Sequence, residues 1–201
     1  MIDSILQYDK QLLLSLNGSH SLFADGLMLT LTDAKTWIPM YVALLYLVIK
    51  NNNSMTKILA IIAGAALCVL FTGTLDDLFV KPVVARWRPT HDPEIGYMVD
   101  VVDGYRGGRY GFFSALINCW TRIYLGVHYP IDIAVGLLWG AFVAVLVYVL
   151  FNVVTRSTNG HNNYISTQYT STGYVVTDTD VVVSVFVFTL MYALVRASII
   201  I

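Results

Sequence analysis

Long apolar segments constrain the fold of this chain more than any other feature. One of them runs from Ile131 to about Val154 and contains a single charged residue, Asp132. A helix that crosses a bilayer needs about 20 consecutive apolar residues, so this segment predicts a transmembrane helix. Charged residues make up 12% of the chain, whereas soluble domains have roughly 25%. We therefore expect an integral membrane protein. The net charge of −1 gives no reason to expect nucleic acid as a partner.

The predicted fold class is all-α: a polytopic membrane helix bundle with about four spanning helices. The N-terminal segment Ile2–Leu16 has apolar and charged residues at helical spacing, which predicts an additional amphipathic helix on the membrane surface or against the bundle. A buried strand is the alternative for the last span, which is rich in Val and Phe, but its 21 residues favour a helix. The expected spans are about Trp37–Ile49, begun near Leu29 and tolerating Lys35, then Ile58–Val80, Ile131–Val154 and Val181–Ile201.

The basic residues are concentrated in one part of the chain. Six of the 12 Lys and Arg residues lie between Lys81 and Arg122. If the spans alternate, Lys50, Lys57 and Arg156 lie on the opposite side of the membrane. A simple count of positive charges would place the larger cluster in the cytoplasm. Cations held in a folded anion site do not report on insertion, however, so we expect the smaller group to be cytoplasmic and the cluster to be extracytoplasmic.

Two spaced motifs within this region suggest phosphate chemistry. The first is Lys81, six residues, then Arg88-Pro89, and the second is Arg122, five residues, His128, three residues, then Asp132. Fixed cations neutralise the charge that develops on phosphoryl oxygens. Lys81 and Arg88 are two helical turns apart and can point the same way. Taken alone, this pair is more typical of a juxtamembrane cluster that holds lipid head groups.

His128 and Asp132 change that balance. Pro130 lies between them, so His128 is expected just before a helix that carries Asp132 in its first turn. An Asp in that place could accept the Nδ1 proton of His128 and leave Nε2 free to attack phosphorus. A lone histidine near a membrane interface is more often structural. Because His128 occurs together with Arg122 and the first motif, we favour a catalytic role for it.

Both motifs resemble those of the type 2 phosphatidic acid phosphatase (PAP2) family, membrane enzymes that share their core with vanadium haloperoxidases. The pattern of that family is Lys-x6-Arg-Pro, then Pro-Ser-Gly-His, then Ser-Arg-x5-His-x3-Asp. The segments Gly107–Ser114 and Arg122–Pro130 look like the bacterial branch that acts on undecaprenyl diphosphate and related lipids. The resemblance covers most of the chain up to about Phe151.

The resemblance implies a role for each matching residue. His128 would be the nucleophile that forms a phosphohistidine, and Asp132 would orient it. Thr121 replaces a serine of the family and keeps the hydroxyl. The family uses no metal, and the resemblance implies no cofactor. The implied phosphate-binding residues are Lys81, Arg88, Ser114 and Arg122.

The middle motif departs from the family pattern. Ala115 and Leu116 follow Ser114, where the family has a small residue and then the histidine that protonates the leaving oxygen. Seven residues, Ser114–Trp120, precede Thr121, where the family usually has a hairpin of two membrane helices. General acid catalysis is worth ~10²–10⁴-fold. His91 could replace the acid, although His91-Asp92-Pro93 is more typical of a solvated turn.

The leading hypothesis is therefore a membrane phosphatase that hydrolyses a lipid phosphate or diphosphate, either undecaprenyl diphosphate or a glycerolipid phosphate, in the bacterial inner membrane. The phosphatase domain would cover residues 1–154, incomplete between 114 and 121, and residues 155–201 would add a polar loop and a C-terminal span. The alternative is a catalytically impaired, truncated member that only binds anionic lipid. A transporter is disfavoured because no repeat is found. A homo-oligomer would allow a partner chain to complete the bundle.

Overall fold

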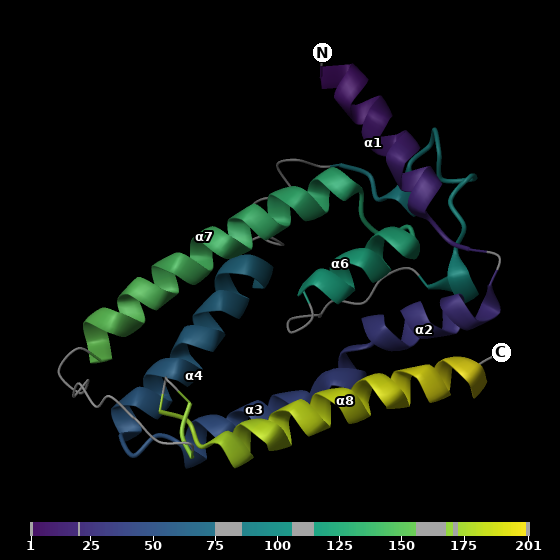
Figure 1. The fold of residues 1–201 in the computed structure, drawn as a ribbon. Coiled ribbons are helices and arrows are strands. Elements are labelled where there is room, and N and C mark those ends of the chain that lie inside the picture. Colours follow the sequence, from purple (N-terminus) through teal and green to yellow (C-terminus); the bar gives the residue numbers. More distant parts are fainter. Residues whose placement is uncertain are drawn as a thin grey trace.

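The fold is all-α, as the sequence predicts, and it is seen in a computed structural model (Figure 1). Three helical segments within the described part of the chain are long and apolar enough to cross a membrane: Met55–Gly73, Pro130–Thr155 and Val176–Ile199. The predicted spans from Ile131 and from Val181 are thus confirmed as helices. The structure describes residues 2–19, 21–74, 86–105, 115–155, 168–170 and 173–199.

The first predicted span is wrong in its continuity. Helix α2 (Leu22–Thr32) ends at Asp33, a short 3-10 helix follows (Ala34–Trp37), and α3 begins at Ile38 and ends at Lys50. The break has a local cause, because the Asp33 side chain accepts a hydrogen bond from the Lys35 N–H at 3.0 Å and starts a new helix there.

Side chains satisfy the carbonyl groups that this break leaves without helical partners. The Thr36 hydroxyl donates to the Thr30 carbonyl at 2.8 Å, and the Trp37 indole N–H donates to the Leu31 carbonyl at 2.9 Å. Trp37 is 2% exposed and stacks on Phe186. A broken helix needs neighbouring groups to bond the backbone that it frees, which is what these two side chains do.

Helix α8 (Val176–Ile199) lies along both α2 and α3, as Figure 1 shows. A side chain at Gly26 would collide with the backbone of Ala197, so α2 and α8 approach closely through small residues. At the other end of α8, Lys50 forms an ion pair of 2.7 Å with Asp178. The segment from α2 to α3 therefore accompanies α8 over its length, and we call it the interrupted span.

Helices α4 and α7 form a second packed group. Helix α4 (Met55–Val69) continues through a π-helical turn (Leu70–Thr74) and packs along α7 (Pro130–Thr155). The expected second span began at Ile58, close to the observed start, and its predicted end at Val80 lies outside the described residues. Outward-facing apolar side chains are abundant on α7, including Leu138 and Val153, as a lipid-facing surface requires.

Two smaller helices connect these groups to the predicted site. The predicted N-terminal helix is confirmed as α1 (Ile2–Leu16), and α6 (Ala115–Tyr124) packs against α2 and leads into α7. The 26 residues of α7 extend for about 39 Å at 1.5 Å per residue. The N-terminus of α7 adjoins α1 and α6, whereas the N-terminus of α8 lies at the opposite end of the helices (Figure 1). Asp178 in the first turn of α8 pairs with Lys50 at the end of α3.

Candidate active site

A tight turn between α6 and α7 positions His128. The N–H groups of Val127 and His128 point to the Arg122 carbonyl at 2.9 and 3.4 Å. Gly126 has φ +64°, and a Cβ there would collide with the Val99 side chain. Only glycine fits this left-handed and crowded position without strain. The prediction that His128 lies just before the helix that carries Asp132 is confirmed, because α7 begins two residues later at Pro130.

Arg86 connects the first motif to the second. Its Nη1 donates to Asp132 Oδ1 at 2.8 Å, and its Nη2 donates to Asp9 Oδ2 at 2.8 Å. The guanidinium carbon lies 3.9 Å from the centre of the Tyr129 ring, a cation–π distance. Sequence reasoning gave Arg86 no role, although it lies inside the first motif, two residues before Arg88.

Asp9 of α1 is the second residue that the sequence analysis missed. Its carboxylate is 1% exposed and accepts hydrogen bonds from Arg86 and from the Ile131 N–H at 3.0 Å. That N–H belongs to the first turn of α7, where backbone donors have no partner within the helix. One buried carboxylate therefore holds Arg86 and caps the helix that carries Asp132. Asp9 looks in the sequence like one of several polar residues of an amphipathic helix, so nothing there distinguishes it.

A third contact joins α1 to the loop after the first motif. The Lys10 ammonium lies 3.0 Å from Asp92 and 2.8 Å from Glu94, and the Tyr129 hydroxyl donates to Asp92 at 2.6 Å. Burial works to raise the pKa of Asp92, but hydrogen bonds from Tyr129, the Glu94 N–H and Lys10 together hold it below its ordinary value. The expectation of a solvated turn is therefore wrong for Asp92, which is 8% exposed.

The fully buried Tyr129 is thus shared by both networks. Its ring supports Arg86 and its hydroxyl bonds Asp92. Burial raises the pKa of Tyr129, and the neighbouring Asp92 carboxylate raises it further, so the phenol stays protonated and remains a donor. The residue next to His128 is therefore immobilised on both its ring and its hydroxyl.

An open hollow of 500 Å³ lies beside this cluster, lined by Arg86, Trp87, Arg88 and His91. Arg88 and His91 are exposed, and Arg86 is half-buried. Arg88 brings a guanidinium group to the hollow, and its planar fork of donors favours an anion with several oxygens. The Arg86 guanidinium at the same hollow is already paired with Asp132 and Asp9. The His91 Nδ1 lies 3.0 Å from the Thr90 hydroxyl. The hollow is thus suited to a phosphate group.

The structure brings part of the predicted site together. Asp132 contacts Arg86, which is two residues from Arg88, and the turn at Gly126 joins Arg122 to His128. Lys81 and Ser114 lie outside the described residues. Thr121 is fully buried, and its hydroxyl donates to the Asn118 carbonyl at 3.0 Å. The Thr121 hydroxyl is therefore used in a hydrogen bond within α6.

Comparison with known proteins assigns the family. The profile of the PAP2 superfamily matches residues 109–156, which contain the second motif. A "Lipid A 4'-phosphatase" of Bacteroides thetaiotaomicron is 33% identical over 186 residues, covering 77% of this chain and 82% of the relative. A "Lipid A 4'-phosphatase" of Porphyromonas gingivalis is 32% identical over 179 residues, covering 75% of each chain. No solved structure matches significantly.

The first of these alignments is longer than the part of this chain that it covers, so the relative has residues without a counterpart here. The second motif and the similarity over three quarters of the chain lead to one conclusion. The chain belongs to the PAP2 superfamily and is a membrane lipid phosphatase, a hydrolase of phosphoric monoesters.

Proposed function

We propose that this phosphatase works through a phosphohistidine on His128. The observation that carries the proposal is the tight turn that holds His128 between Arg122 and the N-terminus of α7. Nε2 of His128 would attack phosphorus while the bond from phosphorus to the lipid oxygen breaks. Water would then cleave the phosphorus–nitrogen bond, which releases inorganic phosphate and regenerates the histidine. Arg88 and Arg122 would neutralise the phosphoryl oxygens, together with Lys81 and Ser114.

Asp132 would orient His128 through its ring N–H, as the family resemblance implies. The structure adds support for a fixed Asp132, because Arg86 bonds one carboxylate oxygen at 2.8 Å and is itself held by Asp9. A carboxylate accepts several hydrogen bonds, so the ion pair with Arg86 leaves acceptor capacity for an imidazole. Arg86 would thus act on the nucleophile through Asp132.

The first substrate to consider is a phosphomonoester on a glycolipid, because both relatives are named for the 4'-phosphate of lipid A. Undecaprenyl diphosphate and a glycerolipid phosphate are the substrates expected from the motifs alone. The open hollow at Arg86 and Arg88 supports a bulky head group rather than a small enclosed one. We place the site on the periplasmic face of the bacterial inner membrane, which is supported by its position at the opposite end of the helices from Lys50 and Lys57.

Binding of anionic lipid without turnover is the competing function. The absent acid histidine favours it, because the leaving lipid oxygen must acquire a proton. His91, which lines the hollow beside Arg88, is the one other histidine among the described residues. We propose His91 as the proton donor that replaces the acid of the family.

The deciding experiment is phosphate release by the detergent-purified chain from lipid A, undecaprenyl diphosphate and phosphatidic acid. We expect release from at least one lipid, and we expect it to disappear in His128→Ala and in Arg88→Ala. Lipid binding should weaken in Arg88→Ala and persist in His128→Ala. A folded wild-type chain that binds these lipids but releases no phosphate would establish the competing function. Release that survives His128→Ala would overturn the proposed nucleophile.

A further inference from the structure

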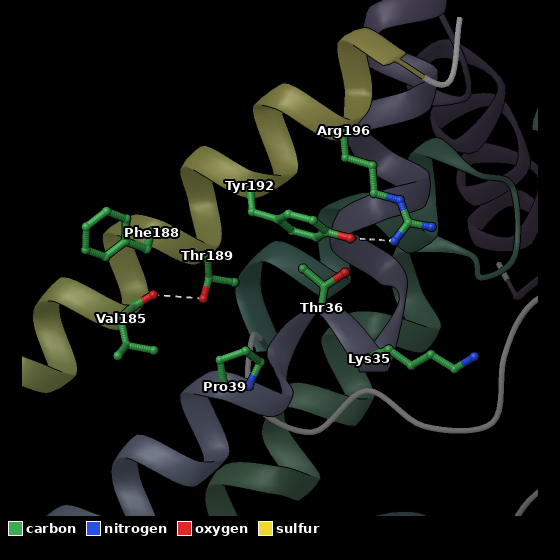
Figure 2. Close-up of a pocket in the computed structure, with 8 residues that line it drawn as sticks. All are labelled: Lys35, Thr36, Pro39, Val185, Phe188, Thr189, Tyr192 and Arg196. Atoms are coloured by element: carbon green, nitrogen blue, oxygen red, sulfur yellow. Dashed lines mark hydrogen bonds between the residues drawn. The ribbon is translucent and has the colours of Figure 1, made fainter.

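A second cationic site lies at the break between α2 and α3, away from the candidate active site. A cavity of 390 Å³ there is lined by Lys35, Thr36, Pro39, Val185, Phe188, Thr189, Tyr192 and Arg196. Its volume falls in the range of about 300–1,000 Å³ that is usual for small-ligand sites. The lining residues come from the 3-10 helix, the start of α3 and the C-terminal half of α8 (Figure 2).

The cavity is polar at one end and apolar at the other. Figure 2 shows Arg196 and Tyr192 projecting from α8 toward the segment that carries Lys35 and Thr36. Val185 lies further along α8, toward its N-terminus, and lines the cavity together with Pro39. Phe188 also belongs to the lining, although its ring projects to the opposite side of α8 from Pro39 in Figure 2. Two cations and two hydroxyl groups therefore stand at the head of an apolar groove.

The charges at this site are not balanced within the described residues. The Arg196 guanidinium donates to the Tyr192 hydroxyl at 2.8 Å, and no described carboxylate pairs with either Arg196 or Lys35. The nearby Asp33 carboxylate bonds the backbone N–H of Lys35. Cations next to membrane-spanning helices are costly unless an anion or water compensates them. The described part of the chain therefore supplies no anionic partner for these two cations.

The depth of the site matches the layers of a bilayer. Arg196 lies three residues before the end of α8 at Ile199, where a long basic side chain reaches the interface. Tyr192 belongs to the residue type that is enriched at that level. Phe188 and Val185 lie one and two helical turns from Tyr192 toward the N-terminus of α8, at the level of acyl chains. A phospholipid has the same order of groups: an anionic head, then hydrocarbon.

We propose that this groove binds an anionic phospholipid of the surrounding bilayer, with its phosphate on Lys35 and Arg196 and one acyl chain against Pro39, Val185 and Phe188. The bound lipid bridges the interrupted span and α8, and it neutralises two cations that face the membrane. This role does not depend on catalysis at His128. The C-terminal end of α8 packs against the N-terminal half of α2, and α2 also packs against α6, which leads into the candidate active site. The lipid therefore belongs to the leaflet on the active-site side.

The test is lipid retention by the full chain in nanodiscs that contain equal amounts of phosphatidylglycerol and phosphatidylcholine. After extraction into mild detergent, co-purified lipid is measured by mass spectrometry. We expect selective retention of phosphatidylglycerol by the wild type. Each basic residue at a membrane surface adds roughly fivefold to the attraction for anionic lipid, so Lys35→Gln with Arg196→Gln should lower retention by roughly 25-fold. Lys57→Gln, at the other end of the bundle, is the matched control and should retain as much as the wild type.

Three further results would discriminate among occupants. Arg196→Lys keeps the charge and should preserve most of the selectivity, and raised salt should weaken retention by the wild type without any substitution. Equal retention of the two lipids by the wild type would overturn the proposal. Undiminished retention of phosphatidylglycerol by a folded double variant would also overturn it. A double variant that dissociates from dimer to monomer but retains the lipid would overturn it as well.

Discussion

Asp9 and Arg86 lie 77 residues apart in the chain, yet their carboxylate and guanidinium groups are 2.8 Å apart, with the carboxylate fully buried. The same carboxylate receives the Ile131 N–H. This pair thus fastens an N-terminal helix to the motif that precedes Arg88 and to the helix that carries Asp132. Helix α1 is part of the support of the active site.

Removing this carboxylate should weaken both stability and turnover. Asp9→Ala leaves Arg86 with one acid partner and the Ile131 N–H with none, so we expect the free energy of unfolding to fall by about 3 kcal/mol. Displacement of Asp132 should slow phosphate release by up to ~10²-fold. Thermal unfolding and phosphate release in detergent measure the two effects. Asp3→Ala changes an exposed carboxylate of the same helix, and equal losses in both variants would contradict the role of Asp9.

The turn at Gly126 should tolerate no side chain. Gly126→Ala forces a left-handed alanine, which costs about 1–2 kcal/mol, and pushes its Cβ into Val99. We expect the displaced turn to move His128 and to abolish most phosphate release, with a lower melting temperature. Gly136→Ala is the matched control, because a Cβ at that position of α7 meets nothing within 4 Å. Full activity of Gly126→Ala would show that His128 does not need this turn.

His91 offers a test of how the leaving oxygen is protonated. It shares the hollow with Arg86 and Arg88, and histidine is the side chain that most often acts as a general acid in enzymes. We expect His91→Gln to lower phosphate release from a lipid substrate by ~10²-fold, at the lower end of general acid effects. An activated aryl phosphate, whose leaving group needs no proton, should be hydrolysed at the wild-type rate. Equal losses on both substrates would mean that His91 is not the acid.

The packing of α1 should depend on pH through Lys10 and Asp92. The pKa of Asp92 lies below 3.8 in the folded chain, so its stabilising effect is complete above that pH and is lost as the pH falls through the folded value. Hydrogen bonds to Glu94 and to Asp92 raise the pKa of Lys10 above 10.5. The stabilising effect of Lys10 is therefore complete below pH 10.5 and is lost as the pH rises through the pKa of Lys10 in the folded chain.

The difference in melting temperature between the wild type and Lys10→Gln reports this effect. We expect the difference to be constant between pH 3.8 and 10.5 and to shrink beyond each end of that range. A difference that is unchanged down to pH values where Asp92 is protonated would show that Lys10 acts without its acid partner.

The interrupted span gives a prediction about stability alone. Trp37→Phe keeps a buried aromatic ring but removes the N–H that bonds the Leu31 carbonyl, so that carbonyl is left without a donor. We expect the free energy of unfolding to fall by about 1–3 kcal/mol in detergent. Trp120→Phe alters a residue that is 47% exposed and should change the free energy of unfolding little. Phosphate release should remain near the wild-type value in both variants.

Local patterns in the sequence were sufficient for most of the helices and for the second motif. The apolar run from Ile131 and the Arg122–His128 spacing follow from periodicity and neighbouring residues alone. The break at Asp33 also has a local signal, since an Asp before a short polar stretch is a typical helix start. The predicted span extends across this break to Leu29, because the apolar run from Trp37 is shorter than the ~20 residues that a span needs.

The supporting contacts of the site had no such signal. The Asp9–Arg86 and Tyr129–Asp92 pairs join residues 77 and 37 positions apart, and neither lies at a spacing set by a helix. Their partners are chosen by the packing of α1 against α6 and α7, which periodicity does not specify. Buried carboxylates such as Asp9 and Asp92 look like solvated residues until the cations beside them are known.

The break between α2 and α3 also affects the order in which the protein can be made. These helices have 11 and 13 residues, and neither reaches the ~20 residues of an independent span. Both rest on α8, which the ribosome synthesises more than 120 residues after α3. During translation the first apolar segments therefore enter the membrane before their partner exists, and their final arrangement must wait for Val176–Ile199. A nascent chain halted before α8 would hold an unfinished first span, a natural substrate for membrane quality control.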